Sequence, residues 1–201
     1  ICTTDDPADT LEYHQKLKAE GFPVKVLPAF RPDKAVNVDR DTFVPYMKKL
    51  GVSSYEQLVQ TLEARIDYFH ENGCRLSDHA LDAVPFALGN PAAVFEKAMA
   101  GGALSPQEAD CFKTAVLTAC AGKYAELGWA MQLHMGAMRN NNTAMFQRLG
   151  ADTGYDSVND LCIAEPLSRF LDALEAEGYW FVTVEELLEL NGIQPKAGAM
   201  Y

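Results

Sequence analysis

The sequence predicts an α/β fold in which about four parallel strands alternate with helices. Short apolar or β-branched stretches suit buried strands, and the segments between them carry apolar residues at helical spacing. Strands that are joined through a helix run parallel. Polar residues gather where the strand candidates end, and this βαβα rhythm indicates the α/β class. The four strand candidates are residues 1–4, 22–30, 74–79 and 129–133.

The expected helices follow from apolar periodicity and from residues that begin or end a helix. In the first, Asp9 or Thr10 can act as the cap. In the fifth, Ser105 and Glu108 form a capping box around Pro106. A further short strand is expected at residues 179–184, and the chain then ends in a helix and a tail. The expected helices are residues 8–20, 41–50, 55–72, 91–100, 105–127, 163–177 and 185–190.

Composition excludes several classes of protein. The 201 residues are 48% apolar, which is enough for a core, and the net charge of −11 argues against nucleic acid as a partner. No apolar run reaches the length of about 18 residues that a membrane span needs. The five cysteines are scattered without a CxxC pair, which predicts free thiols and a cytoplasmic location. The chain opens without methionine on an apparent strand end, which predicts a piece of a longer protein.

Candidate functional residues lie at the ends of the predicted strands. His134 closes an apolar run and is followed by Arg139 and three asparagines. A histidine there can ligate a metal or move a proton, and an arginine can hold a carboxylate. Arg31 and Asp78 end two other strands, and in a barrel such ends meet at one mouth. Two arginines favour an anionic substrate, most simply a carboxylate, and a carboxylate facing a histidine can relay protons.

A purely structural interpretation of these residues is also open. His134 can be a core histidine beside a polar turn, and Asp5 and Asp6 can serve as a helix cap and a turn. Asp33 follows Pro32 and suits turn chemistry. Asp78 beside His79 has no such local explanation, which makes it the more informative pair.

Four motifs resemble the uronate (glucuronate) isomerases of the amidohydrolase superfamily. They are TTDDPxDxLEYH at residues 3–14, RPDK at residues 31–34, GCRxSDH at residues 73–79 and QLHxGAxRNNNTxMFxxLGxDTGxDS at residues 132–157. The resemblance implies a partial (β/α)8 TIM-barrel-like domain over residues 1–177, with helical insertions. It also implies isomerisation of hexuronates in carbohydrate metabolism, D-glucuronate to D-fructuronate and D-galacturonate to D-tagaturonate.

Carried over residue by residue, the resemblance makes Asp78 and His134 catalytic and makes Arg31 and Arg139 substrate-binding. His134 would also ligate a divalent metal, with zinc the usual ion. The His-x-His pair of the family's first strand and the aspartate of its last strand are not in this sequence. We therefore expect an incomplete metal site and impaired activity in this chain, and a possible homo-oligomer that covers the open sheet edges.

The end of the chain carries a second resemblance. Residues 171–201 are similar to the C-terminal end of NodB-type polysaccharide deacetylases, and residues 178–201 would form a strand and helix tail of that kind. Carbohydrate deacetylation is therefore one alternative function. The other is a non-catalytic α/β remnant that folds without turnover.

Overall fold

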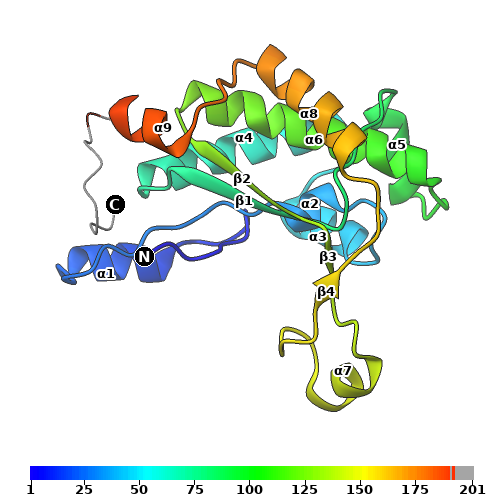
Figure 1. Ribbon diagram of the computed structural model, residues 1–201, viewed down its shortest axis with the longest axis horizontal. Coiled ribbons are helices and arrows are strands. Elements are labelled where there is room, and N and C mark those ends of the chain that lie inside the picture. Colours follow the sequence, from blue (N-terminus) through cyan, green and yellow to red (C-terminus); the bar gives the residue numbers. More distant parts are fainter. Residues whose placement is uncertain (191, 193–201) are drawn as a thin grey trace.

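The computed structural model describes residues 1–190 and 192, and it confirms the α/β class. Figure 1 shows helices packed around a short sheet, with a small hairpin and helix projecting from the body. The strands are β1 (Leu76–Leu81), β2 (Ala130–Met135), β3 (Ala137–Met138) and β4 (Ser157–Val158). The helices are α1 (Glu12–Ala19), α2 (Asp33–Val36), α3 (Phe43–Leu50), α4 (Tyr55–Glu71), α5 (Pro91–Met99), α6 (Pro106–Glu126), α7 (Thr143–Leu149), α8 (Ala164–Ala176) and α9 (Val184–Leu190).

Four extended segments lie side by side in parallel order, but only two of them are regular strands. β1 and β2 pair in parallel, with Asp78 opposite Gln132 and Ala80 opposite His134. Single parallel bridges, Asp5 to Phe30 and Phe30 to Ser77, add residues 1–5 and 27–30 on the other side of β1. The sheet is therefore shorter than expected, and the partial eight-stranded barrel stays a prediction.

The core lies where the second extended segment meets α4, α6 and the start of β2. Phe30 is fully buried, and its ring packs edge-on against Phe69, Tyr124 and Trp129 at centroid distances of 5.0, 6.1 and 6.3 Å. Aromatic rings in this geometry attract each other in addition to burying apolar area. The cluster therefore holds residues 27–30 in place although they form no regular strand.

The predicted helix starts are right where a side chain caps the helix and wrong at α1. The capping box of α6 is confirmed, with the Ser105 hydroxyl accepting from Glu108 N–H at 3.2 Å. α1 begins at Glu12 instead of residue 8, because Asp6 and Asp9 accept from the N–H groups of Ala8 and Leu11. Such local bonds to aspartate side chains compete with a helical turn.

The predicted strand at residues 179–184 is wrong. Residues 179–183 have no regular structure, and α9 begins at Val184. The Thr183 hydroxyl accepts from Glu186 N–H at 3.2 Å, while Glu186 accepts from Thr183 N–H at 2.7 Å. This reciprocal pair is a capping box, which favours a helix start over continued extension. The predicted tail beyond α9 lies outside the described residues except for Gly192.

The projection consists of β3, β4 and α7. β3 and β4 form an antiparallel pair that carries α7, and no residue of α7 is buried. In the body, α6 packs against α4, α8 and β2.

Within residues 1–190 and 192, no helix is both long and apolar enough to cross a membrane.

His79 predicts a pH-dependent stability. Burial, together with the smaller effect of the Arg31 charge, lowers the pKa of this fully buried imidazole from 6.5 to about 3. His79 therefore gains a proton below pH 6.5 in the unfolded chain, but only near pH 3 in the folded chain. The resulting stability is present above pH 6.5 and is lost as pH falls through this window, at up to about 1.4 kcal/mol per pH unit.

Urea unfolding between pH 7.5 and 5 tests this expectation. His79→Leu should flatten the loss of stability relative to the unmodified chain, and the difference isolates the imidazole from other titrating groups. Ser77→Ala is the matched control, because it removes the hydroxyl 3.1 Å from His79 Nε2 and keeps the imidazole. Equal slopes for the unmodified chain and His79→Leu would contradict the expectation.

Candidate active site

Asp78 is the centre of a polar cluster on β1. The Arg31 guanidinium donates through Nη2 to Asp78 Oδ2, and the Asp78 side chain is only 7% exposed. Arg31 reaches it because backbone bonds from Phe30 N to Leu76 O and from Asp78 N to Phe30 O fix the register of the two segments. A buried carboxylate needs such a charged partner. The prediction that Arg31 and Asp78 lie close together is therefore confirmed, although Asp78 lies within β1 and not at its end.

His134 approaches the other oxygen of the same carboxylate. Its Nδ1 lies 2.9 Å from Asp78 Oδ1, and its side chain is half exposed. The opposite ring nitrogen, Nε2, lies 2.8 Å from Gln132 Nε2. His134 sits within β2, one residue before its end, and the parallel register brings it beside β1. One side of the imidazole thus faces the carboxylate, and the ring remains accessible to a ligand.

Asp33 is a member of the cluster that sequence reasoning missed. It begins α2, with Oδ2 3.7 Å from Arg31 Nε and with Oδ1 accepting from Ala80 N–H at 3.3 Å. Burial raises the pKa of Asp33 from 3.8 to about 6, against the opposing effects of the Ala80 N–H and Arg31. The sequence assigned it to a turn after Pro32. The sequence signal for including Asp33 was its position two residues after Arg31. Its partial burial, however, depends on its contact with β1, which the sequence does not show.

Arg139 is not brought to this cluster. It follows β3, and its Nη1 donates to Asp156 Oδ2 at 2.8 Å. The N–H of Asn140 donates to the other oxygen of Asp156, and this bond, with Arg139, lowers the pKa of that carboxyl. Of the four residues that were expected to meet, Arg31, Asp78 and His134 lie close together and Arg139 does not. The substrate-binding role of Arg139 stays a prediction.

The remaining strand-end residues have structural partners. His79 alternates with Asp78 along β1 and points into the core, so the two neighbours do not form a functional pair. Burial raises the pKa of Asp6, but hydrogen bonds from Tyr46, Ala8 and Lys34 outweigh it and lower the value. The Asp5 carboxylate accepts from the Thr3 hydroxyl at 2.6 Å. Asp6 thus accepts from Ala8 within a turn, and its bonds with Tyr46 and Lys34 also connect this turn to α3 and α2.

The cluster offers only part of a metal site. Asp78 Oδ1 and His134 Nδ1 are an oxygen and a nitrogen of the kinds that bind zinc, and Asp78 Oδ1 is buried without a hydrogen-bond partner. Zinc sites in proteins use three or four protein ligands. Among the described residues, no group of three or more His, Cys, Asp or Glu side chains could hold a metal. The described residues therefore do not complete a metal site.

Comparison with known proteins gives the family context. A family model described as glucuronate isomerase matches residues 1–184. A uronate isomerase from Caldicellulosiruptor saccharolyticus is 52% identical in an alignment 187 residues long that covers 88% of this chain and 40% of that protein. One from Bacillus pumilus is 49% identical over 186 residues, 88% of this chain and 39% of its own. The chain thus spans about 40% of the length of the curated relatives it matches.

Solved structures agree with this context. The crystal structure of a uronate isomerase from Thermotoga maritima matches with a TM-score of 0.80 and 35% identity, over 88% of this chain and 42% of that one. A glucuronate isomerase from Caulobacter crescentus matches in fold, with a TM-score of 0.74 at 24% identity. The comparisons give no support to the deacetylase resemblance of residues 171–201, and the isomerase match itself continues to residue 184.

The buried pair of Arg31 and Asp78 predicts a strong dependence of folding on the guanidinium. Arg31→Gln should lower the free energy of unfolding by about 3–5 kcal/mol, because it leaves the Asp78 carboxylate buried without its counter-ion. Urea unfolding at pH 7 measures this. The double variant with Asp78→Asn should recover part of the loss, since the unpaired charge is then removed.

Arg169→Gln is the matched control for loss of one arginine. Arg169 pairs with Glu165 one turn earlier on α8, and both side chains are 62% exposed. Its guanidinium also lies 6.0 Å from the centre of the Phe86 ring. Its substitution should change stability by no more than about 0.5 kcal/mol. If Arg31→Gln is no more destabilising than Arg169→Gln, the buried pair does not hold the cluster together.

Proposed function

Because the chain belongs to the glucuronate isomerase family, we propose that Asp78, His134 and Arg31 take part in the aldose–ketose isomerisation of hexuronates. The substrates implied by the family resemblance are D-glucuronate and D-galacturonate, and the products are D-fructuronate and D-tagaturonate. The observation that carries the proposal is one buried carboxylate held between a guanidinium and an accessible imidazole.

The chemistry requires hydrogen to move between C1 and C2 of the open-chain sugar acid. Asp78 and His134 suit a proton route, because Asp78 Oδ1 and His134 Nδ1 lie only 2.9 Å apart. Arg31 orients the carboxylate through a charge-assisted bond to its other oxygen. In this route Asp78 accepts the proton of C2 while O1 gains a proton, which gives the enediol. A proton is then delivered to C1 while O2 loses its proton, which gives the ketone. A hydride shift between the two carbons is the competing route.

The finer features implied by the family belong to the same proposal. A divalent metal, zinc in kind, would have His134 as one ligand, supported by the unpartnered Asp78 oxygen beside Nδ1. When bound, such an ion polarises a substrate oxygen. The parallel order of the four extended segments supports a partial barrel of the amidohydrolase type. A cytoplasmic location and a homo-oligomeric state complete the proposal and rest on composition and on the open sheet edges.

Asp78→Asn is expected to lower the formation of ketouronate by at least about 100-fold, because the amide cannot accept the proton. The assay supplies D-glucuronate and zinc ions to the 201-residue chain and measures ketouronate, and His134→Ala is expected to behave in the same way. In D₂O, the proton route predicts deuterium on the product carbon, whereas a hydride shift predicts none.

A second readout does not depend on turnover. Addition of D-glucuronate should shift the NMR signals of the His134 ring, and D-glucose, which lacks the carboxylate, should not. Asp172→Asn, on the exposed face of α8, is the matched control for loss of a carboxylate. Turnover retained in Asp78→Asn or in His134→Ala would remove that residue from the mechanism.

A further inference from the structure

A cavity of about 440 Å³ lies between α1, residues 22–27 and the turn that joins α4 to β1. We call it the α1 cavity. Figure 1 shows α1 at one end of the body, away from the projection that carries α7. The volume falls within the range of about 300–1,000 Å³ that small-molecule sites occupy in proteins. The α1 cavity is therefore large enough for a small ligand.

The α1 cavity lies toward the other end of the sheet from the Asp78 cluster. Leu27 and Gly73 line it, and each precedes the parallel bridge that joins Phe30 to Ser77. The guanidinium and the carboxylate of the cluster belong to residues that follow this bridge. Because neighbouring segments run parallel, residues before and after the bridge lie toward opposite ends of the sheet. A ligand in the α1 cavity would therefore bind apart from the candidate active site.

The cavity remains unfilled because polar contacts, and not an apolar face, hold α1 against the body. No residue of α1 is buried. Gln15 Nε2 donates to the Tyr68 hydroxyl on α4 at 2.8 Å, and His14 Nε2 lies 3.7 Å from Asp5 Oδ2. Leu17, on the same helix, lines the cavity and is not part of the apolar core. The space beside the helix is thus left open to a ligand.

The walls of the cavity expose apolar surface to water. Phe22 and Val24 line it, and they are 50% and 44% exposed. The opposite wall is formed where Gly73, with a φ of +96°, lets the chain turn from α4 into β1. A Cβ at this position would lie 3.0 Å from Leu27 Cδ2, so the turn packs closely against residue 27. A ligand that covers these walls gains the free energy of removing apolar surface from water.

Three cations line the same cavity, although the chain as a whole has a net charge of −11. They are Lys18, Lys25 and Arg75. Within residues 1–190 and 192, no carboxylate lines the α1 cavity or forms an ion pair with any of the three. Arg75 donates through Nη1 to the carbonyl oxygens of His70 and Cys74 at 3.0 and 2.6 Å, and neutral carbonyls leave its charge uncompensated. The lining therefore favours an anion.

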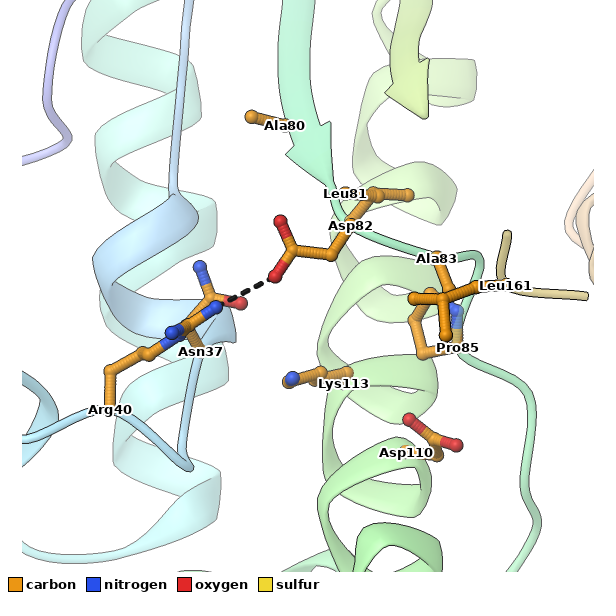
Figure 2. A pocket seen from close by; sticks show the side chains of 10 residues that line it. All are labelled: Asn37, Arg40, Ala80, Leu81, Asp82, Ala83, Pro85, Asp110, Lys113 and Leu161. Atoms are coloured by element: carbon orange, nitrogen blue, oxygen red, sulfur yellow. Dashed lines mark hydrogen bonds and ion pairs between the residues drawn. The ribbon is translucent and has the colours of Figure 1, made fainter. Parts of the chain in front are cut away.

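The cavity at the end of β1 shows the contrasting case. In Figure 2, Asp82 points toward Arg40, and Lys113 and Asp110 lie on the same cavity. Arg40 Nη2 lies 2.7 Å from Asp82 Oδ2, and Lys113 Nζ lies 2.9 Å from Asp39 Oδ2. The cations of that cavity are already paired with acids of the chain. Those of the α1 cavity are free to pair with an acid that comes from outside.

We propose that the α1 cavity binds a small amphipathic anion, an apolar chain or ring that ends in a carboxylate or phosphate group. The apolar part lies against Leu17, Phe22 and Val24, and the anionic group pairs with the lysines and Arg75. Hydrogen bonds between charged groups are stronger than neutral ones, so the head group fixes the orientation of the ligand. The inference does not depend on the proposed function, because none of these residues belongs to the candidate active site.

Octanoate is the probe that tests this site, with binding to the 201-residue chain measured by isothermal titration calorimetry at low ionic strength. Octylamine has the same apolar chain and the opposite charge, and it should bind at least about tenfold more weakly. Pentanoate is shorter by three methylene groups and should also bind at least about tenfold more weakly, since a buried methylene is worth about fourfold in affinity. Comparison with octyl phosphate identifies the preferred head group. Equal affinities for octanoate and octylamine would overturn the proposal.

The double variant Lys18→Gln with Lys25→Gln should weaken octanoate binding about tenfold, the combined scale of two exposed ion pairs. Both lysines are exposed, so the variant should fold as the unmodified chain does. Lys16→Gln with Lys48→Gln is the matched control. These two lysines are also exposed, they lie on α1 and α3, and neither lines the cavity, so the affinity should not change.

The apolar part of the site has its own test. Phe22→Ala should weaken octanoate binding about fivefold, because less apolar surface is covered. Tyr13→Ala is the matched control, since this aromatic residue of α1 is 72% exposed and lies outside the lining. The NMR signals of the Val26 and Leu27 methyl groups should shift when octanoate is added, because both residues line the cavity.

Other results would overturn the inference. If neither the double lysine variant nor Phe22→Ala changes the affinity, octanoate binds elsewhere on the surface. The same holds if the methyl signals that shift belong to α7 and not to residues 24–27. If octanoate does not bind at all, the α1 cavity is not a site for an amphipathic anion. None of these results bears on the formation of ketouronate, so the proposed function stands or fails separately.

Discussion

The contact between Arg31 and Asp78 is the interaction on which the functional part of this structure depends. A carboxylate with a 7% exposed side chain is unstable without a counter-ion, and the guanidinium comes from the end of a segment that is not a regular strand. The aromatic packing of Phe30 fixes that segment beside β1. One oxygen of Asp78 is thereby occupied and the other faces His134. Three neighbouring segments of the sheet thus contribute one side chain each to a single site.

A polar cavity lies further along β1 than this cluster and is lined by residues from the loop after α2, from the end of β1 and from α6. Asp78 and Ala80 lie on one face of β1, while α2 contributes Asp33 to the cluster and the loop after α2 contributes Arg40 to the cavity. Each cation along this face has carboxylate neighbours, and the contacts range from a buried pair at Arg31 to an exposed one at Arg40. This difference in burial separates a contact that maintains structure from one that a ligand can replace.

The projection formed by β3, β4 and α7 has its own internal contacts. Arg139 and Asn140 bind Asp156, and the Asn142 side chain accepts from Met145 N–H to cap α7. Residues of the family motif that contains three asparagines thus make structural contacts within the projection. Since the chain spans about 40% of the length of its curated relatives, the comparisons place this motif within a larger protein in those relatives.

The sequence by itself determined the α/β class, the long helices α4 and α6 and the capping box of α6, and it indicated Arg31, Asp78 and His134 as residues that would lie close together. These depend on apolar periodicity, on caps and on motif resemblance, which are properties of short stretches. Only the tertiary structure decided that Asp33 is partly buried, that Arg139 binds Asp156 and that Arg40 lines a polar cavity. The physical reason is that burial and the choice of ionic partner depend on segments distant in sequence, and those distances are set only when the sheet forms.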